Sequence, residues 1–213
     1  MFASKAIIDN LVGLNEPKVI ELVRNALDEG VAAKEILNQG LIAGMDIVGE
    51  KMENEDMFIP EVLMAAKAMS SAIEILKPLL AEEDIRAMGK VIIGTVKGDL
   101  HDIGKNLVAM MVESAGFEVY DLGADILPDK FIQEIKEKDA NILCMSALLT
   151  TTMPMMKNTI DALKESGLRE QVKIMVGGAP VTQSFADEIG ADGYAPDAGS
   201  AVKLAKELLQ CNS

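Results

Sequence analysis

The stretch from Lys90 to Gly104 reads KVIIGTVKGDLHDIG and decides the fold class. Its first part, residues 90–96, is a short β-rich run, and the rest is a polar loop that leads into the amphipathic segment KNLVAMMVESAG at 105–116. A strand followed directly by a helix is the opening of a βαβ unit. The sequence therefore predicts an α/β fold from this point onward.

The same alternation continues toward the C-terminus. Further strands are expected at 117–123, 141–148 and 172–178 and near Gly193, with helices beginning near Ile103, Pro128, Thr152, Thr182 and Asp197. This order predicts a doubly wound, parallel five-stranded sheet of the Rossmann-like (flavodoxin-like) kind, with helices on both faces. Ligands of such sheets bind beyond the carboxyl ends of the strands, so we look for function in the loops that follow them.

The N-terminal part has a different pattern. Apolar residues recur three or four positions apart between residues 4 and 80, as at Val19, Leu22 and Val23, and strand signals are absent there. Breaks at 13–17, 29–30 and 57–60 divide this part into about four helices. Since the polar segment 81–89 separates the two patterns, we expect a four-helix bundle over residues 1–85 and a sheet domain over residues 90–213.

Composition narrows the class of partner. The formal net charge of −14 argues against nucleic acid or an anionic membrane, because both are bound through Lys and Arg patches. The chain has no apolar run of about twenty residues, and its N-terminus lacks the pattern of a signal peptide, so a cytoplasmic protein is expected. Cys144 and Cys211 have no disulfide or metal spacing and are interpreted as free thiols.

The loop after the first expected strand contains the only histidine of the chain, His101. Asp99 stands two residues earlier, where its carboxylate can bind one imidazole nitrogen and leave the other free, as for histidines that bind metals. One protein ligand cannot hold a bare ion, but it suffices for a metal in a macrocycle that brings its own four nitrogens. Taken alone, His101 is better explained as a polar loop residue or a helix-cap contact, and only its context favours a ligand.

Other chemistries lack their signatures. The chain contains neither GxxxxGK[ST] nor GxGxxG, which disfavours nucleotide hydrolysis and nicotinamide chemistry. A nucleophile paired with His101 is conceivable at Ser146 or Cys144, but neither residue lies in a nucleophile-elbow motif.

Three short motifs occur at characteristic separations. DxHxxG is formed by Asp99, His101 and Gly104, SxL by Ser146 and Leu148, and GG by Gly177 and Gly178. This pattern resembles the cobalamin-binding domain of cobalamin-dependent methionine synthase and of the corrinoid proteins of methylamine and methanol methyltransferase systems. The segment MFIPEVLMAAKAM at 57–69 resembles the part of that family that caps the upper face of the corrinoid.

The resemblance implies base-off binding of cobalamin (methylcobalamin or a related corrinoid), with His101 as the axial ligand of cobalt. It also implies a relay through Asp99 to Thr152, where methionine synthase has a serine; the alternative for Thr152 is a helix N-cap. The cofactor-binding set expected from the resemblance is Gly98, Asp99, Leu100, His101, Asp102, Gly104, Ser146, Leu148, Thr150, Thr152, Gly177, Gly178, Ala179 and, in the helical cap, Phe58. Each glycine taken alone is better explained as a turn or packing residue.

The function implied is that of a methyl carrier in one-carbon metabolism, without catalytic residues of its own. Its expected partners are a donor-specific methyltransferase, a second methyltransferase acting on a thiol or tetrahydropterin, and a reductive activase. The methyl donor stays open among methylamines, glycine betaine, methanol and aryl methyl ethers. Alternatives are a cobalamin-binding sensor or regulator, the small subunit of a cobalamin-dependent mutase, and a flavodoxin-like module that binds no corrinoid.

Overall fold

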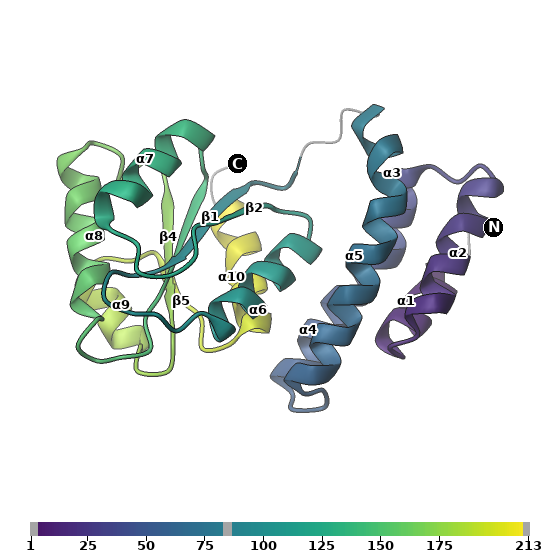
Figure 1. Ribbon diagram of the computed structural model, residues 1–213, viewed down its shortest axis with the longest axis horizontal. Helices are drawn as coiled ribbons and strands as arrows, with labels where there is room; N and C mark the ends of the chain where they lie inside the picture. The colour runs from purple at the N-terminus through teal and green to yellow at the C-terminus, as the bar shows by residue number, and fades with distance from the viewer. Residues whose placement is uncertain (1–3, 83–86, 211–213) are drawn as a thin grey trace. The chain divides into compact units, whose positions relative to one another are not determined.

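The structure is a computed structural model that describes residues 4–82 and 87–210 (Figure 1). The described residues form two compact units. We call residues 4–82 with 114–116 the helical unit, and residues 87–113 with 117–210 the sheet unit. Residues 83–86 of the expected linker, and Cys211, lie outside the described residues.

The sheet unit contains a five-stranded parallel sheet, which confirms the predicted fold class. The strands are β1 (Lys90–Thr95), β2 (Glu118–Asp121), β3 (Ile142–Ser146), β4 (Lys173–Gly177) and β5 (Gly193–Tyr194), in the order β2-β1-β3-β4-β5. The central strands β1, β3 and β4 are buried almost throughout, as expected for a sheet covered on both faces.

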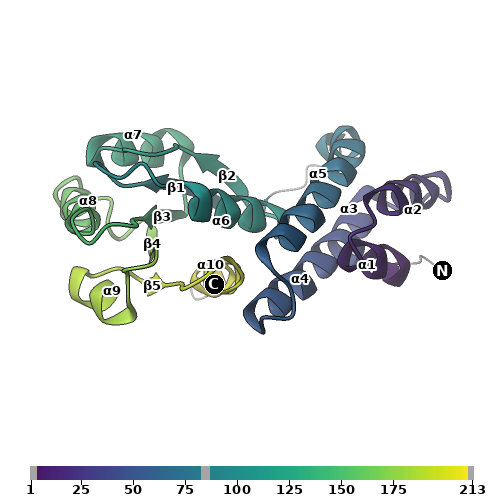
Figure 2. The ribbon, with the colours of Figure 1, turned by 60° about the horizontal axis from the view of Figure 1, so that its bottom comes forward.

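Helices cover both faces of this sheet. They are α6 (Ile103–Ser114), α7 (Pro128–Lys138), α8 (Pro154–Glu165), α9 (Gln183–Ile189) and α10 (Ala198–Gln210). Figure 2 shows α6 and α10 on one face of the sheet and α7, α8 and α9 on the other. Thr182 precedes α9 as an N-cap whose hydroxyl accepts a hydrogen bond from the Phe185 N–H at 3.2 Å.

One hydrophobic core cluster lies between the sheet and helices α7 to α9. Phe131 of α7 and Met156 of α8 are fully buried there against β-strand residues such as Leu143. A Cβ at Gly94 of β1 would lie 2.7 Å from the Phe131 ring, so glycine allows α7 to pack closely on the sheet. Cys144 follows Leu143 on β3 and therefore faces the other side of the sheet, where it is also buried, and burial raises the pKa of its thiol to about 12.

The sheet order reverses at β1, because β2 lies on one side of it and β3 on the other. Such a switch point is where ligands bind in open parallel sheets. Thr95 pairs with Ser146 and Ser146 with Gly177, so three adjacent strands end at the same level. The loops that carry the three sequence motifs therefore leave the sheet side by side.

The helical unit contains four helical segments, as predicted. They are α1 (Ser4–Val12), α2 (Glu16–Asp28), a continuous segment formed by α3 (Ala33–Ile36), the π-helical turn η1 (Leu37–Ile42) and α4 (Ala43–Glu53), and lastly α5 (Ile59–Glu82). Helices α1 and α4 pack closely, since a Cβ at Gly44 would lie 2.7 Å from Leu11. The π-helical turn was not predicted. No helix in the described part of the chain is long and apolar enough to cross a membrane.

Candidate functional site

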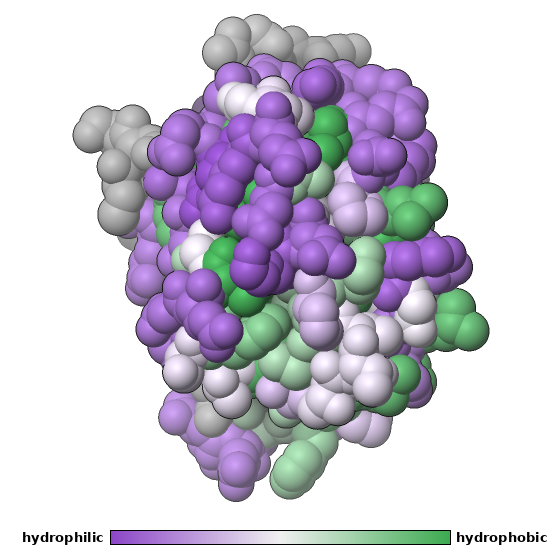
Figure 3. All heavy atoms as spheres, turned by 90° about the vertical axis from the view of Figure 1, so that its left-hand side faces the viewer, coloured by the Kyte–Doolittle hydropathy of each residue, from purple (hydrophilic) through white to green (hydrophobic). Residues whose placement is uncertain are grey.

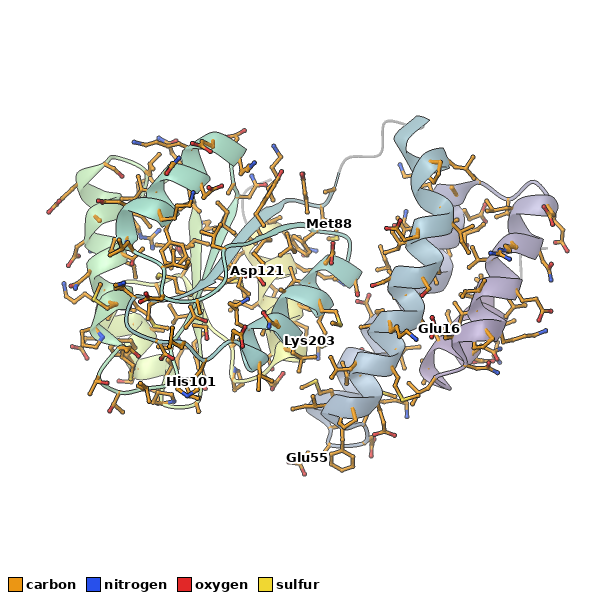
Figure 4. All side chains as sticks on the ribbon, in the orientation of Figure 1. Glu16, Glu55, Met88, His101, Asp121 and Lys203 are labelled. Carbon is orange, nitrogen blue, oxygen red and sulfur yellow. The ribbon has the colours of Figure 1, made fainter. Side chains whose placement is uncertain are left out.

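His101 lies in the loop between β1 and α6, at the carboxyl ends of the strands, and is labelled in Figure 4. About half of its side chain, 52%, is exposed. Its backbone is fixed to the sheet because the buried Thr95 hydroxyl donates to the His101 carbonyl at 2.9 Å. The last residue of β1 therefore supports the ligand candidate directly.

Asp99 is fully buried beneath His101 and is surrounded by donors. Its Oδ1 lies 2.7 Å from His101 Nδ1 and 3.1 Å from the His101 backbone nitrogen. Its Oδ2 accepts from the N–H groups of Leu148 and Leu149, at 2.8 and 3.2 Å, and lies 2.8 Å from the Thr152 hydroxyl. A buried carboxylate without a cationic partner is stable only when it is hydrogen-bonded in this way.

These contacts fix the charge of Asp99 and the proton of the imidazole. Burial by itself would raise the pKa of Asp99, but the hydrogen bonds from His101, Leu148 and Thr152 together hold it well below its ordinary value. The carboxylate is therefore ionised at neutral pH and can only accept, so Nδ1 carries the proton. Nε2, which has no hydrogen-bond partner among the described residues, then presents its lone pair.

The SxL loop between β3 and α8 contributes to the site mainly through its backbone. Leu148 is 42% exposed as a residue, and its backbone N–H group donates a hydrogen bond to Asp99. Because α8 begins at Pro154 with Met153 before it, Thr152 is not the N-cap. The Thr152 hydroxyl lies 2.8 Å from both Asp99 Oδ2 and the Leu149 carbonyl, and the ionised carboxylate is the stronger acceptor for its single proton.

The two glycines at the end of β4, Gly177 as its last residue and Gly178 directly after it, face the SxL loop. The Ala147 N–H donates to the Gly177 carbonyl at 3.2 Å. Gly178 has a φ of +122°, and a Cβ there would overlap the Ala147 carbonyl. Its glycine is thus required by the packing of the two loops. At Gly104, in the first turn of α6, a Cβ would meet nothing within 4 Å, so neighbouring packing does not explain that glycine.

The other predicted residues occupy exposed or partly exposed positions. Leu100 is 76% exposed, Thr150 and Ala179 are exposed, and Ser146 and Asp102 are half-buried. The positive φ of Gly98, +85°, fits the turn before Asp99. Phe58 belongs to the helical unit, where it is 67% exposed at the start of α5.

Exposed large apolar side chains gather around this end of the sheet unit. They include Leu100, Ile103, Leu127, Leu148 and Leu149, all in or beside the loops at the carboxyl ends of the strands. In Figure 3, hydrophilic residues dominate the upper part of the face shown, and the lower part, toward the carboxyl-end loops, is less hydrophilic. Such an apolar surface around an exposed imidazole suits a large, flat, partly apolar ligand.

Sequence reasoning missed three groups at or next to the site. Leu149 binds Asp99 through its backbone, which carries no side-chain signal. Asp125, in the loop between β2 and α7, contacts the His101 loop. Lys105 of α6 is buried, and its Nζ lies 2.5 and 2.6 Å from the oxygens of Asp121 at the end of β2. A charged residue next to DxHxxG was the available signal for Lys105.

A polar hollow of about 370 Å³ lies far from this chemistry, at the amino ends of the strands. Arg169, in its wall, is engaged by the Asp192 carboxylate at 3.0 Å and by the Gly190 carbonyl at 2.8 Å. Its charge is therefore already compensated within the fold, and we assign the hollow no role in the site.

The site offers one imidazole and no cage of ligands. In the part of the chain that the structure describes, no group of three or more His, Cys, Asp or Glu side chains could hold a metal ion. A metal at His101 must therefore arrive with most of its ligands, as it does within a macrocycle.

Residues 89–203 match the protein family described as B12 binding domain, and residues 3–77 match a second family of the same description. The chain belongs to the B12-binding family. Its cofactor is cobalamin or a related corrinoid, and the exposed Nε2 of His101 fits such a ligand.

Individual relatives agree with this assignment over nearly the whole length of the B12-binding chain. Dimethylamine corrinoid protein 3 of Methanosarcina acetivorans is 47% identical over 203 residues, 95% of each chain. A cobalamin-binding protein of Desulfitobacterium hafniense has a similar structure, with a TM-score of 0.85, 32% identity and coverage of 98% of this chain and 99% of its own. A chain of the methanol:cobalamin methyltransferase complex of Methanosarcina barkeri also has a similar structure, with a TM-score of 0.85 and 29% identity. The match covers 97% of this chain and 79% of that chain.

Proposed function

We propose that this B12-binding chain is a methyl carrier in which Nε2 of His101 is the axial ligand of cobalt. The observation that carries the proposal is the pair formed by His101 and the buried Asp99. The ionised carboxylate keeps the proton on Nδ1, so the remaining nitrogen faces outward as a lone-pair donor. A histidine that served only as a helix cap would need neither this orientation nor a buried carboxylate.

The residues around this pair act as its support. When bound, the cobalt of the corrinoid supplies the centre that accepts a methyl group from a donor and gives it to an acceptor. Asp99 stabilises positive charge on the imidazole as that charge changes, and the Thr152 hydroxyl, 2.8 Å from Asp99, is placed to follow it. The threonine thus provides the hydroxyl that methionine synthase provides with serine.

The lower tail of the cofactor is proposed to lie along the loops after β3 and β4. The open space around Gly104 and the half-exposed Ser146 support this placement. The resemblance adds Thr150, Ala179 and the two glycines Gly177 and Gly178 to that set. Phe58 of the helical unit, with its exposed aromatic ring, is proposed to shield the upper face of the corrinoid from water.

The names of the relatives support a role in methyl transfer from small donors. A relative with 47% identity is called a dimethylamine corrinoid protein, which favours a methylated amine as donor. A structural neighbour belongs to a complex with a methanol:cobalamin methyltransferase, which supports a donor-specific methyltransferase as partner. A second methyltransferase acting on a thiol or tetrahydropterin, and a reductive activase, complete the proposal.

The helical unit favours a carrier over the small subunit of a mutase. Residues 3–77 match a B12 binding domain family of their own, whereas the mutase subunit needs only the sheet domain. A sensor or regulator would use the same pocket, and no described feature favours it.

The test is reconstitution of the chain with hydroxocobalamin under anaerobic conditions, followed by gel filtration and visible spectroscopy. Wild type should retain about one corrinoid per chain, and His101→Ala should bind it with an altered spectrum because the axial nitrogen is gone. Lys173→Gln, at the opposite end of the sheet, is the matched control and should match wild type. Identical spectra for wild type and His101→Ala would refute axial ligation. Methyl transfer from methylcobalamin-loaded protein to a thiol acceptor, with a thiol-specific methyltransferase present, then tests the carrier role.

A further inference from the structure

We propose that Asp125 is the positioning residue for the loop that presents His101. The inference rests on the proposed role of His101 as axial ligand. Asp125 lies in the loop between β2 and α7, outside the three sequence motifs, and it contacts the residues that come just before His101.

Asp125 binds three consecutive residues of the His101 loop. Its Oδ1 accepts from the Gly98 N–H at 2.7 Å, and its backbone N–H donates to the Asp99 carbonyl at 3.0 Å. Its Oδ2 lies 2.8 Å from the Lys97 ammonium. The Lys97 ammonium and the Gly98 N–H also hold the pKa of Asp125 below its ordinary value, so it is ionised at neutral pH. One residue thus fixes the backbone on both sides of the peptide between Gly98 and Asp99.

The backbone of Asp125 is held in an uncommon conformation to make these contacts. Its φ is +63°, in the left-handed region that aspartate and asparagine tolerate better than most residues. The neighbouring chain continues the pairing of β1 with β2, since Ile126 N–H donates to the Thr95 carbonyl at 3.0 Å. Val96 and Ile126 form an isolated parallel bridge beyond the strand ends. The β2–α7 loop is therefore attached to the sheet before it reaches the His101 loop.

The contacts of Asp125 affect the position of the His101 loop more than the free energy of unfolding of the protein. The side chains of Lys97 and Asp125 are 43% and 39% exposed, and ion pairs of such exposure contribute little to the free energy of unfolding. An axial ligand, in contrast, must be held within about 0.5 Å of its productive position by the residues behind it. Because Asp99 sets the imidazole orientation, displacement of the Gly98–Asp99 peptide displaces Nε2 as well.

Three variants separate the contributions of the Asp125 carboxylate, of its charge and of its ion pair with Lys97. Asp125→Gly removes the carboxylate while keeping the backbone N–H and accepting the positive φ without strain. Asp125→Asn keeps an oxygen that can accept from Gly98, also tolerates the positive φ, and removes the charge. Lys97→Met removes the ion pair alone. The thermal unfolding midpoint of each variant checks that it folds.

The first readout uses the protein without cofactor. Amide hydrogen exchange of Gly98, followed by NMR, should be about tenfold faster in Asp125→Gly, a factor that corresponds to about 1.4 kcal/mol. Asp125→Asn and Lys97→Met should exchange within about twofold of wild type. Equal Gly98 exchange in wild type and Asp125→Gly would overturn the proposal.

The second readout is the visible spectrum after reconstitution with hydroxocobalamin. Asp125→Gly should bind the corrinoid with a smaller fraction in the His-ligated form than wild type, and Asp125→Asn should restore that fraction. A wild-type spectrum in Asp125→Gly would also overturn the proposal. If His101→Ala does not alter the spectrum, axial ligation itself is refuted, and the exchange of Gly98 then decides separately whether Asp125 positions the loop.

Discussion

Asp99→Asn is the substitution that tests the orientation of His101 most directly. The asparagine amide has nearly the shape of the carboxylate, but one of its two oxygens becomes an NH₂ donor. If the NH₂ group faces Leu148 and Leu149, it meets two backbone N–H groups. If it faces His101, it meets only one backbone N–H group, that of His101, and the ring can move its proton to Nε2 and accept from the amide at Nδ1, which is the less costly arrangement.

The magnitude follows from the proton that must move. With the proton on Nε2, that nitrogen has no lone pair for a metal. Presentation of Nε2 would require an Nδ1–H opposite the amide NH₂, which leaves a donor unsatisfied at a cost of about 1–3 kcal/mol. The equilibrium constant for axial ligation in Asp99→Asn should therefore fall by roughly 5- to 150-fold.

The assay is the visible spectrum of the reconstituted variant, which gives the fraction of corrinoid with histidine bound. Asp139→Asn makes the same chemical change at an exposed position after α7 that tolerates asparagine, and it should behave as wild type. A wild-type fraction of His-ligated corrinoid in Asp99→Asn would refute the reasoning, because the proton on Nδ1 would then not depend on the charge of Asp99.

Three further results are expected. Thr152→Val removes a hydrogen bond to a buried carboxylate and should lower the free energy of unfolding, measured in urea, by about 1–3 kcal/mol. Thr152→Ser keeps the hydroxyl and should restore the wild-type value. Equal urea midpoints for wild type, Thr152→Val and Thr152→Ser would contradict this. Because the folded-state pKa of Asp99 lies below its ordinary value of 3.8, its stabilisation should be complete above that pH and decline as the pH falls below it. Acid unfolding of wild type and Asp99→Asn should differ in slope there, and parallel curves would count against the linkage. Gly178→Ala should lower the free energy of unfolding by more than about 2 kcal/mol, because the new methyl group would overlap the Ala147 carbonyl. Thermal unfolding would compare it with Gly190→Ala, a position with a positive φ but open space around it. Similar losses in the two variants would exclude the overlap as the cause.

The sequence predicted those features that depend on side-chain patterns. The parallel sheet followed from strand and helix periods that alternate, and the approach of His101 and Asp99 followed from their separation of two residues in a tight loop. The hydrogen-bonded pair could be anticipated because it is local in the chain. The complete burial of Asp99 could not be anticipated, because it depends on the loop around Leu148, about fifty residues away in the chain.

Features that depend on backbone groups or distant loops gave no signal. The N–H group of Leu149 binds Asp99 whatever its side chain is. Asp125 reaches Gly98 only because β1 and β2 are neighbours, and its segment reads as an ordinary turn. The sequence allowed two interpretations of Thr152, a partner of Asp99 or the N-cap of the next helix. The N-cap interpretation was excluded only by the structure, in which α8 begins at Pro154 after Met153.

The π-helical turn η1 allows the helical unit to lose one residue at this point, which a regular α-helix does not allow. A π-helical turn contains one residue more than an α-helical turn, so the segment between Ile36 and Leu41 carries one surplus residue. Both flanking side chains are fully buried, whereas Asn38 and Gln39 between them are exposed. Loss of either exposed residue would leave the buried pair four positions apart, on one face of an uninterrupted α-helix. Chain length can therefore change by one residue here without rotating the apolar face of α4 away from its neighbours.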